Sequence, residues 1–316
     1  MERNYKKNMT KNKIENAKKL LRSGELVIFP TETVYGIGGN ANDKNAIKKI
    51  YKIKKRPTKN PIICHFASIK EINKEFNLNK IEKLLAKKLW PGPITLVLKK
   101  KNKSKISNLV SNNSSYVGCR IPKNQLALDL LESLDFPLAA PSANFSERTS
   151  VTRFEDLDKK LIKKIFTIRG KQSKLGLEST VIKVKKNNIE LLRLGSITAS
   201  DILKLVNKSK IKFITNSKIS PGNLKKHYAT KKKIRINVKK IKDDEGLINF
   251  GKNNLRSKII NLNLSKKGNL KEASKNLFHF LHKLDQSKCK KIAIAPIPNI
   301  ELGLTINDRI KRASKK

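Results

Sequence analysis

The chain has 316 residues and a formal net charge of +47, with 38% hydrophobic residues. This length predicts about two domains, each able to bury a core without covalent support. The three cysteines lie far apart and form no C-x-x-C pair, which argues against a disulfide framework or a zinc ribbon and favours a reducing cytoplasm. No apolar run approaches the roughly eighteen residues that cross a bilayer, so we expect neither secretion nor membrane insertion.

The positive charge is spread along the whole chain. Lysine doublets and triplets, such as residues 99–101 and 231–233, alternate with Asn and Ile and do not form one tail. A codon bias toward Lys, Asn and Ile would produce the same distribution of residues, and we favour that interpretation over a dedicated nucleic-acid surface. Weak, salt-sensitive and non-specific RNA binding would follow from the charge in either case.

The first predicted elements bring two polar runs together. Thr10 is expected to cap the first helix, and the apolar residues 26–29 are expected to form a strand. The run 30–38 (PTETVYGIG) follows this strand, and Asp43 opens an amphipathic helix that leads to the basic run 54–61 (KKRPTKNP). Hydroxyl groups and fixed positive charge at the ends of elements are typical of a site for a charged small molecule.

Two common nucleotide motifs do not explain this unit. Gly36, Gly38 and Ala41 fit a loose G-x-G-x-x-A spacing, but a Pro-Thr-Glu-Thr insertion separates the strand from the glycines. Basic residues also stand where an acidic ribose ligand is expected, which argues against a nicotinamide site. No G-x-x-x-x-G-K-[ST] run occurs, so any nucleotide would bind without a P-loop.

Alternating strands and helices predict an α/β or α+β domain over residues 1–206. Its later strands are expected at residues 61–66, 94–98, 116–121, 138–140, 165–168, 180–184 and 189–193. Helical periodicity around Leu84, Leu130 and Leu161 separates several of them.

A polar connector at residues 207–233 has the composition of a linker between domains. Residues 234–316 then form a small second domain. Its predicted strands and helices alternate as a short parallel βαβ unit, with strands at 258–262 and 291–295 and helices at 271–284 and 304–312.

Two further features are better explained as structure than as chemistry. The turn Trp90-Pro91-Gly92-Pro93 is expected to pack between a helix and a strand. His279 and His282 are three residues apart on a predicted helix, a spacing that suits a metal, but no third ligand stands at a regular offset. We therefore predict no metal site in the protein.

Small and hydroxyl-bearing residues recur where strands begin or end. Residues 140–144 (APSAN) place small side chains and hydrogen-bonding groups directly after a predicted strand. The runs GLEST at 176–180 and LRLGS at 192–196 repeat this theme. A ligand could therefore approach the backbone closely at several strand ends.

These runs together resemble the threonylcarbamoyl-AMP synthase family. PTETVYGIG, KKRPTKNPIICH, WPGPITLVL, VGCRIP, APSANFS, GLESTVI and LRLGSI occur in the order seen in that family. The resemblance is strong over residues 20–200, and the run from Gly303 to Arg309 with the linker pair His227-Tyr228 is similar to its two-domain, YrdC-like branch. It implies a YrdC-like twisted open mixed sheet with helices, plus a small Rossmann-like C-terminal domain.

The resemblance also implies a reaction. Threonine, bicarbonate and ATP would give threonylcarbamoyl-AMP and pyrophosphate, by adenylyl transfer to N-carboxy-threonine. The product would pass to tRNA-modifying threonylcarbamoyl transferase machinery for the threonylcarbamoyladenosine modification, and double-stranded RNA binding is a further property that we expect. Mg²⁺ would accompany ATP and would not need a dedicated protein cage.

Site residues follow from the matching positions. Lys54 and Arg56 match the K-x-R pair of the family and are the expected catalytic cations, because fixed charge offsets the repulsion between a carbamate and ATP. The expected ATP-binding residues are Arg56, Asn60, Tyr116, Ser142, Asn144, Ser150, Arg193 and Tyr228. The expected threonine-binding residues are Thr33, His65, Arg120, Ala140 and Ser179, with the planar guanidinium of Arg120 suited to the amino-acid carboxylate.

The chain departs from the family pattern at a few loop positions. Glu147 stands where the family has glycine after the PSAN run, and Val151, Leu194 and Thr230 replace prolines. These changes affect loop stiffness more than ligand chemistry.

An RNA-binding module with a basic concave surface is the alternative function.

Overall fold

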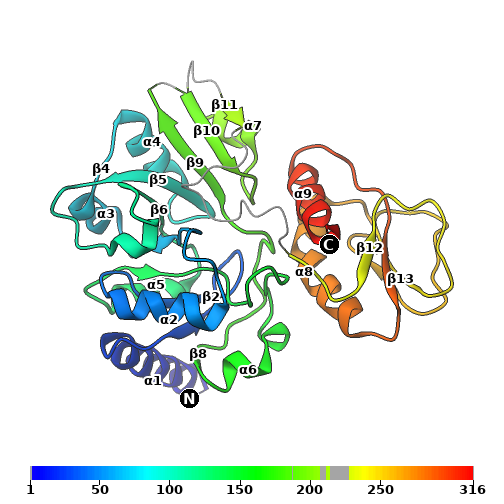
Figure 1. The fold of residues 1–316 in the computed structure, drawn as a ribbon, viewed down its shortest axis with the longest axis horizontal. Helices are drawn as coiled ribbons and strands as arrows, with labels where there is room; N and C mark the ends of the chain where they lie inside the picture. The colour runs from blue at the N-terminus through cyan, green and yellow to red at the C-terminus, as the bar shows by residue number, and fades with distance from the viewer. Residues whose placement is uncertain (1, 187, 207–210, 214–227, 316) are drawn as a thin grey trace.

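The computed structural model describes residues 2–186, 188–206, 211–213 and 228–315. It contains one large mixed sheet with helices and a separate small sheet with two helices (Figure 1). This arrangement confirms the predicted α/β class and the small α/β unit at the carboxyl end. Among the described residues, the helices are all too short or too polar to cross a membrane.

The large sheet joins strands that are distant in the sequence. Its order is β11-β10-β9-β5-β6-β3-β7-β2-β1-β8, with β4 paired to β5. The strands are β1 (Val27–Phe29), β2 (Gly36–Asn40), β3 (Cys64–His65), β4 (Phe76–Asn77), β5 (Ile94–Lys100), β6 (Tyr116–Arg120), β7 (Leu138–Ala139), β8 (Phe166–Thr167), β9 (Thr180–Lys185), β10 (Asn188–Arg193) and β11 (Ile211–Phe213). Strands β3 and β6 run parallel and β3 and β7 antiparallel, so the sheet is mixed.

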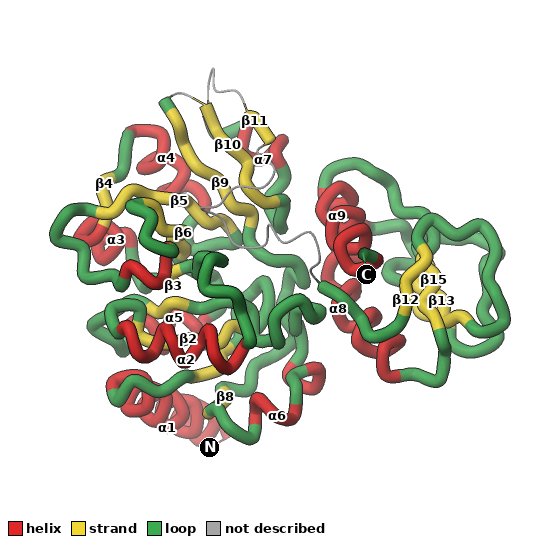
Figure 2. The backbone as a smooth tube through the Cα atoms, viewed as in Figure 1, coloured by secondary structure: helices red, strands yellow, loops and turns green. Residues whose placement is uncertain are grey.

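Helices cover both faces of the large sheet (Figure 2). They are α1 (Glu2–Arg22), α2 (Lys44–Lys54), α3 (Ile69–Glu75), α4 (Lys80–Leu89), α5 (Gln125–Glu132), α6 (Lys159–Ile162) and α7 (Ala199–Leu203), with 3-10 turns at Asn108–Ser111 and Phe154–Asp156. Strand β1 shows why both faces are apolar. Val27 and Phe29 pack in the cluster with α1 and α5, whereas Ile28 packs in the cluster with α2 and α4, since successive side chains of a strand point to opposite faces.

The small domain is a parallel sheet covered by helices. Its strands are β12 (Lys233–Arg235), β13 (Glu245–Asn249), β14 (Asn261–Asn263) and β15 (Lys291–Ile294), in the order β12-β15-β13-β14. All three strand pairs are parallel, as the βαβ pattern predicted. Helices α8 (Leu270–Gln286) and α9 (Leu302–Ser314) lie on the side of this sheet that faces the large domain (Figure 1).

Some boundaries differ from the sequence prediction. Helix α1 begins at Glu2, so the cap expected at Thr10 is wrong; Lys, Glu and Met are good helix formers and extend the helix upstream. The strand expected at 258–262 is β14, which begins only at Asn261 because the hydroxyl of Ser257 accepts from the backbone N–H of Ile259 and holds a turn there. Strands β12 and β13 were not predicted.

The two domains meet at close backbone contacts. Gly176 has φ +75°, and a Cβ placed on it would lie 2.4 Å from the carbonyl oxygen of Ser274. The Ser274 hydroxyl donates to the Leu175 carbonyl at 2.9 Å, and the Thr305 hydroxyl donates to the Gly195 carbonyl at 3.0 Å. Helices α8 and α9 therefore contact the loops that precede β9 and follow β10.

Most of the predicted linker falls outside the described residues. Ser220, Pro221, Gly222 and His227 are among the positions not described, whereas Tyr228 is described and buried. The division into residues 1–206, 207–233 and 234–316 stays a prediction.

Candidate active site

One pocket brings together most of the predicted site residues. Its volume is about 600 Å³, including a mouth open to solvent, and loops at the ends of several strands form its walls. Nine of the predicted residues line it: Thr33, Arg56, His65, Ala140, Ser142, Ser179, Arg120, Arg193 and Tyr228. Lys54, Asn60, Tyr116, Asn144 and Ser150 do not.

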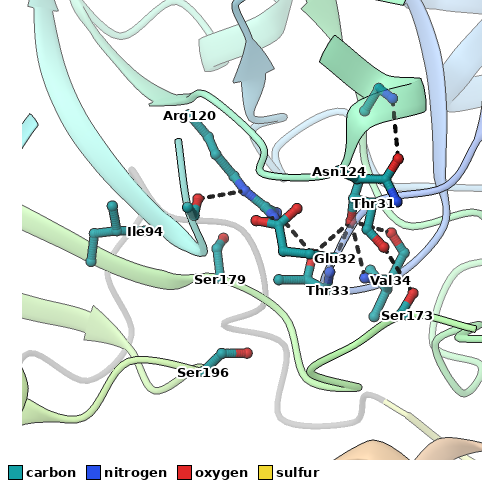
Figure 3. Close-up of polar contacts among 12 residues, drawn as sticks. Thr31, Glu32, Thr33, Val34, Ile94, Arg120, Asn124, Ser173, Ser179 and Ser196 are labelled. Atoms are coloured by element: carbon teal, nitrogen blue, oxygen red, sulfur yellow. Dashed lines mark hydrogen bonds and ion pairs between the residues drawn. The ribbon is translucent and has the colours of Figure 1, made fainter. Parts of the chain in front are cut away.

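The PTET turn after β1 is held by its own first threonine. The hydroxyl of Thr31 donates to the Val34 carbonyl at 2.6 Å and accepts from the backbone N–H groups of Thr33 and Val34 at 3.2 Å. Figure 3 shows these contacts. The turn therefore fixes the Thr33 side chain at the wall of the pocket.

Arg120, at the end of β6, is fixed from three directions. Its guanidinium donates to Glu32 Oε1 at 2.6 Å and to the Thr33 hydroxyl at 2.9 Å, and its Nε donates to the Gly92 carbonyl at 3.3 Å (Figure 3). Both members of the Arg120–Glu32 pair are buried, so the guanidinium charge is balanced within the protein. A guanidinium has five N–H donors, so donors remain for a ligand.

Arg56 and Arg193 supply positive charge to the same pocket. The Arg56 guanidinium donates to the Pro61 carbonyl at 2.9 Å, and that of Arg193 donates to the carbonyl of Ser179 at 2.8 Å and to its hydroxyl at 3.0 Å. The pKa of Arg56 is lowered to about 10. Burial is the main cause, and the positive charge of Arg193 is a smaller one. Arg56 therefore stays protonated at neutral pH. Neither guanidinium donates to an acidic side chain in the contacts described, although the negative charge of Glu178 raises the pKa of Arg193 against the lowering by burial.

His65 is a neutral polar group in the wall. Burial is the main cause that lowers its pKa to about 3, with nearby Arg120 as the second cause. Its ring meets Phe29 edge-on at 6.2 Å, and its Nδ1 is buried without a hydrogen-bond partner among the described residues. An unpaired buried polar atom beside a pocket fits a ligand contact.

Lys54 lies behind the wall, and its ammonium does not line the pocket. It is 1% exposed and donates to the carbonyl oxygens of Ser142 and Asn144, so it supports the APSAN loop. Burial lowers its pKa well below the usual value, with Arg56 as a smaller cause. This placement differs from the expectation that Lys54 faces the reacting anions.

The other four predicted residues also lie outside the lining. The Asn60 Nδ2 and the Asn144 Oδ1 are buried without partners in the described part of the chain. The Ser150 hydroxyl donates to Glu178 Oε1 at 2.6 Å. Tyr116, at the start of β6, packs against a small apolar cluster that includes Ile63 and Val97. The ammonium of Lys183 lies 3.5 Å from the ring centre of Tyr116.

Sequence reasoning missed a buried ion pair next to the pocket. Glu178 lines the pocket, and its Oε2 lies 3.0 Å from Nε of Arg309 on α9. The Arg309 guanidinium carbon also lies 5.0 Å from the ring centre of Tyr228. Glu178 and Arg309 both lie in runs that carried the family resemblance, so the signal was present, but only the fold brings the two runs together.

The substitution of glycine by Glu147 has a structural consequence. Glu147 has φ +65°, in the left-handed region that favours glycine, so the loop keeps the backbone geometry without the glycine. Its carbonyl accepts from the backbone N–H of Ala229 at 2.6 Å, and Arg148 and Ala229 form an isolated parallel bridge. These contacts hold the described end of the linker, and Tyr228 with it, beside the pocket.

The remaining features have structural roles. The indole N–H of Trp90 donates to the Ile94 carbonyl at 2.9 Å, as expected for a packed turn. His279 Nδ1 lies 2.9 Å from Asp156 Oδ2, and His282 Nε2 lies 3.2 Å from the Ser150 carbonyl, so both histidines contact the large domain. Within the described ranges, no group of three or more His, Cys, Asp or Glu side chains could hold a metal ion.

The amino-acid sequence matches two family models in succession. Residues 19–195 match a family described as "Telomere recombination", and residues 197–315 match "Threonylcarbamoyl-AMP synthase, C-terminal domain". The threonylcarbamoyl-AMP synthase of Pyrococcus abyssi is 33% identical over 329 residues, which cover 96% of this chain and 94% of that protein. The chain belongs to the threonylcarbamoyl-AMP synthase family.

Other members of the threonylcarbamoyl-AMP synthase family agree with this assignment. The Bacillus subtilis protein of that name is 32% identical, with 95% of this chain and 92% of that protein covered. A crystal structure of P. abyssi Sua5 complexed with L-threonine superposes with a TM-score of 0.83 at 31% identity, over 95% of this chain and 94% of that one. The Escherichia coli YciO structure gives a TM-score of 0.50 at 25% identity over 58% of this chain and 88% of that one, so the likeness to YciO lies in part of the fold.

Proposed function

We propose that this protein is an L-threonylcarbamoyladenylate synthase, which condenses L-threonine, bicarbonate and ATP to threonylcarbamoyl-AMP, pyrophosphate and water. The observation that carries the proposal is the convergence of Arg56, Arg193 and Arg120 with Thr33 and Ser179 in one pocket. The similarity over almost the full chain to P. abyssi Sua5, solved with L-threonine, supports the same substrate here.

Threonine would bind at the end of the pocket formed by β3, β6 and the PTET turn. The remaining donors of Arg120 would take the carboxylate, and the hydroxyl groups of Thr33 and Ser179 would define a polar pocket. Ala140 would set the space available to the side chain. His65, neutral at physiological pH, would offer its Nδ1 without adding charge.

ATP would bind where Arg56 and Arg193 enter the pocket. A carbamate oxygen would attack the α-phosphorus, the bond from that phosphorus to the β-phosphate oxygen would break, and pyrophosphate would leave. The two arginines would offset the repulsion between the carbamate and the phosphates, because neither guanidinium donates a hydrogen bond to an acidic side chain in the described contacts. Lys54 would act indirectly, by holding the carbonyl groups of Ser142 and Asn144.

Mg²⁺ would enter with ATP, coordinated by phosphate oxygens. In the described part of the pocket Glu178 is the acidic side chain, and its two oxygens accept from Ser150 and Arg309, so the residues present do not form a dedicated cage. The product would be consumed in the cytoplasm by tRNA-modifying threonylcarbamoyl transferase machinery. Binding to double-stranded RNA would be weak and salt-sensitive.

An omission assay tests the proposal. Pyrophosphate release should require threonine, bicarbonate and ATP together, and removal of any one should abolish it. An equal rate without threonine would refute the reaction.

The RNA-binding module is the second candidate, and it is favoured only by the net charge of +47. The two functions respond differently to salt. RNA binding should collapse between low and physiological ionic strength, whereas threonine-dependent pyrophosphate release should persist.

A further inference from the structure

A carboxylate in the nucleotide part of the pocket is a physical problem for the proposed ATP site. Glu178 lines the pocket next to Ser179, and it is 6% exposed. A buried negative charge there would repel a triphosphate unless a cation balances it, because like charges strongly disfavour one another at low dielectric.

The ion-pair partner of Glu178 comes from the C-terminal domain. Arg309, on α9, is 1% exposed, and its Nε donates to Glu178 Oε2 at 3.0 Å. Its other guanidinium nitrogens donate to the Leu194 carbonyl and to Asp308. Residue 309 is 131 positions away from Glu178 in the sequence, so the charge reaches the pocket only when the two domains are in contact.

Arg309 also contacts the surroundings of three predicted ATP-binding residues. Glu178 Oε1 accepts from the Ser150 hydroxyl at 2.6 Å, so Arg309 and Ser150 hold opposite oxygens of one carboxylate. Leu194, whose carbonyl accepts from Arg309, directly follows Arg193. The Tyr228 ring lies under the Arg309 guanidinium at 5.0 Å.

In the threonine part of the pocket, Arg120 and His65 do not depend on α9 in this way. Arg120 is held by Glu32, Thr33 and Gly92, all from the large domain. His65 packs against Phe29 of β1, which also belongs to the large domain. A change at Arg309 should therefore act on one substrate much more than on the other.

We propose that Arg309 is a positioning residue of the ATP site: it cancels the charge of Glu178 and orients Ser150 and Tyr228, so that ATP binds well only when α9 is docked on the large domain. The proposal rests on the proposed function, because that function assigns ATP to this part of the pocket. Arg309 would not touch the reacting atoms.

The test compares the affinities for Mg·ATP alone and for L-threonine alone, by calorimetric titration of the full chain. R309M should weaken ATP binding roughly 10- to 100-fold, since it removes the ion-pair partner of a buried carboxylate, and should change threonine binding by less than about threefold. R309K should recover part of the affinity, because it restores the charge but not the fork geometry. The double variant R309M/E178Q should recover most of it, because the repelling charge is gone. In turnover, KM for ATP should rise more than KM for threonine.

R235M is the matched control. Arg235 also belongs to the C-terminal domain and donates to both oxygens of Glu245, at 2.7 and 2.8 Å, and the Glu245 side chain is fully buried. Arg235 and Glu245 are not among the pocket residues. R235M should therefore lower stability and leave the affinity for ATP unchanged.

Three results would overturn the proposal: ATP binding by R309M equal to wild type, an equal loss of affinity for both substrates, or an equal loss of ATP affinity in R235M. If R309M does not fold, E178Q alone decides, since it should bind ATP at least as tightly as wild type, and weaker binding would contradict the charge argument. A wild-type protein that binds ATP but releases no pyrophosphate would refute the proposed function, while the ATP affinities would still test Arg309. A wild-type protein that does not bind ATP would overturn both.

Discussion

Replacement of Arg56 by alanine is the most direct test of how the pocket handles charge. Arg56 lines the pocket, and its guanidinium donates to the carbonyl groups of Asn60 and Pro61. Loss of one charge-assisted contact with a phosphate costs about 1.5–3 kcal/mol, which corresponds to a roughly 10- to 150-fold slower reaction. The two carbonyl groups that lose their donor would also loosen the loop at residues 57–61, so we expect the larger part of this range.

The assay is pyrophosphate release with saturating threonine and bicarbonate and varied ATP. R56K should be intermediate, because a lysine keeps the charge but cannot donate to two carbonyl groups in the same plane. R169A is the control: Arg169 is exposed and pairs with Glu155 on the surface, where such a pair contributes about 0–1 kcal/mol. If R56A is folded and as active as R169A, Arg56 has no part in the reaction.

Three further predictions concern specificity, pH and the support of the pocket. Valine should be a poorer substrate than serine, because valine lacks the hydroxyl that a polar pocket would bind, and this loss costs more than a missing methyl group, which is worth about 1–3 kcal/mol. Equal turnover of valine and threonine would contradict a polar pocket. The pKa of His65 is about 3 in the folded protein, below the ordinary 6.5, so the unfolded chain binds the extra proton between these values. Stability should therefore fall with decreasing pH in that window by up to about 1.4 kcal/mol per pH unit, and urea unfolding should show a shallower acid dependence for H65Q; an identical dependence would exclude this histidine as the cause. K54M should lower the free energy of unfolding by about 2–5 kcal/mol, since the carbonyl groups of Ser142 and Asn144 lose their buried donor; a K54M protein of normal stability that cannot release pyrophosphate would instead support a direct catalytic role.

Local patterns predicted much of the fold. Asp43 accepts from the N–H of Asn45 and caps α2 as expected. This start was predictable because the capping residue is followed directly by apolar residues at helical spacing. Strand β13 was missed because Glu245–Asn249 is short and contains glycine. Gly246 is explained only by its packing, since a Cβ there would lie 2.9 Å from Ile260 and from Leu284.

The candidate site was predictable to a different extent. Motif order placed nine residues that the structure brings into one pocket. It did not show that the Lys54 ammonium points into the protein, because the direction of a side chain at the end of α2 depends on the APSAN loop packed against it. The Glu32–Arg120 and Glu178–Arg309 pairs join residues 88 and 131 positions apart, and such pairs are fixed by tertiary structure.

Gly176 gives the boundary between the domains an unusual sensitivity to size. A single methyl group at this position would clash with the backbone of α8 at Ser274 and Lys275. Backbone atoms cannot move away by a change of rotamer, as a side chain can. G176A should therefore force the loop before β9 and α8 apart. One added methyl group would then weaken the contact between the loop before β9 and α8.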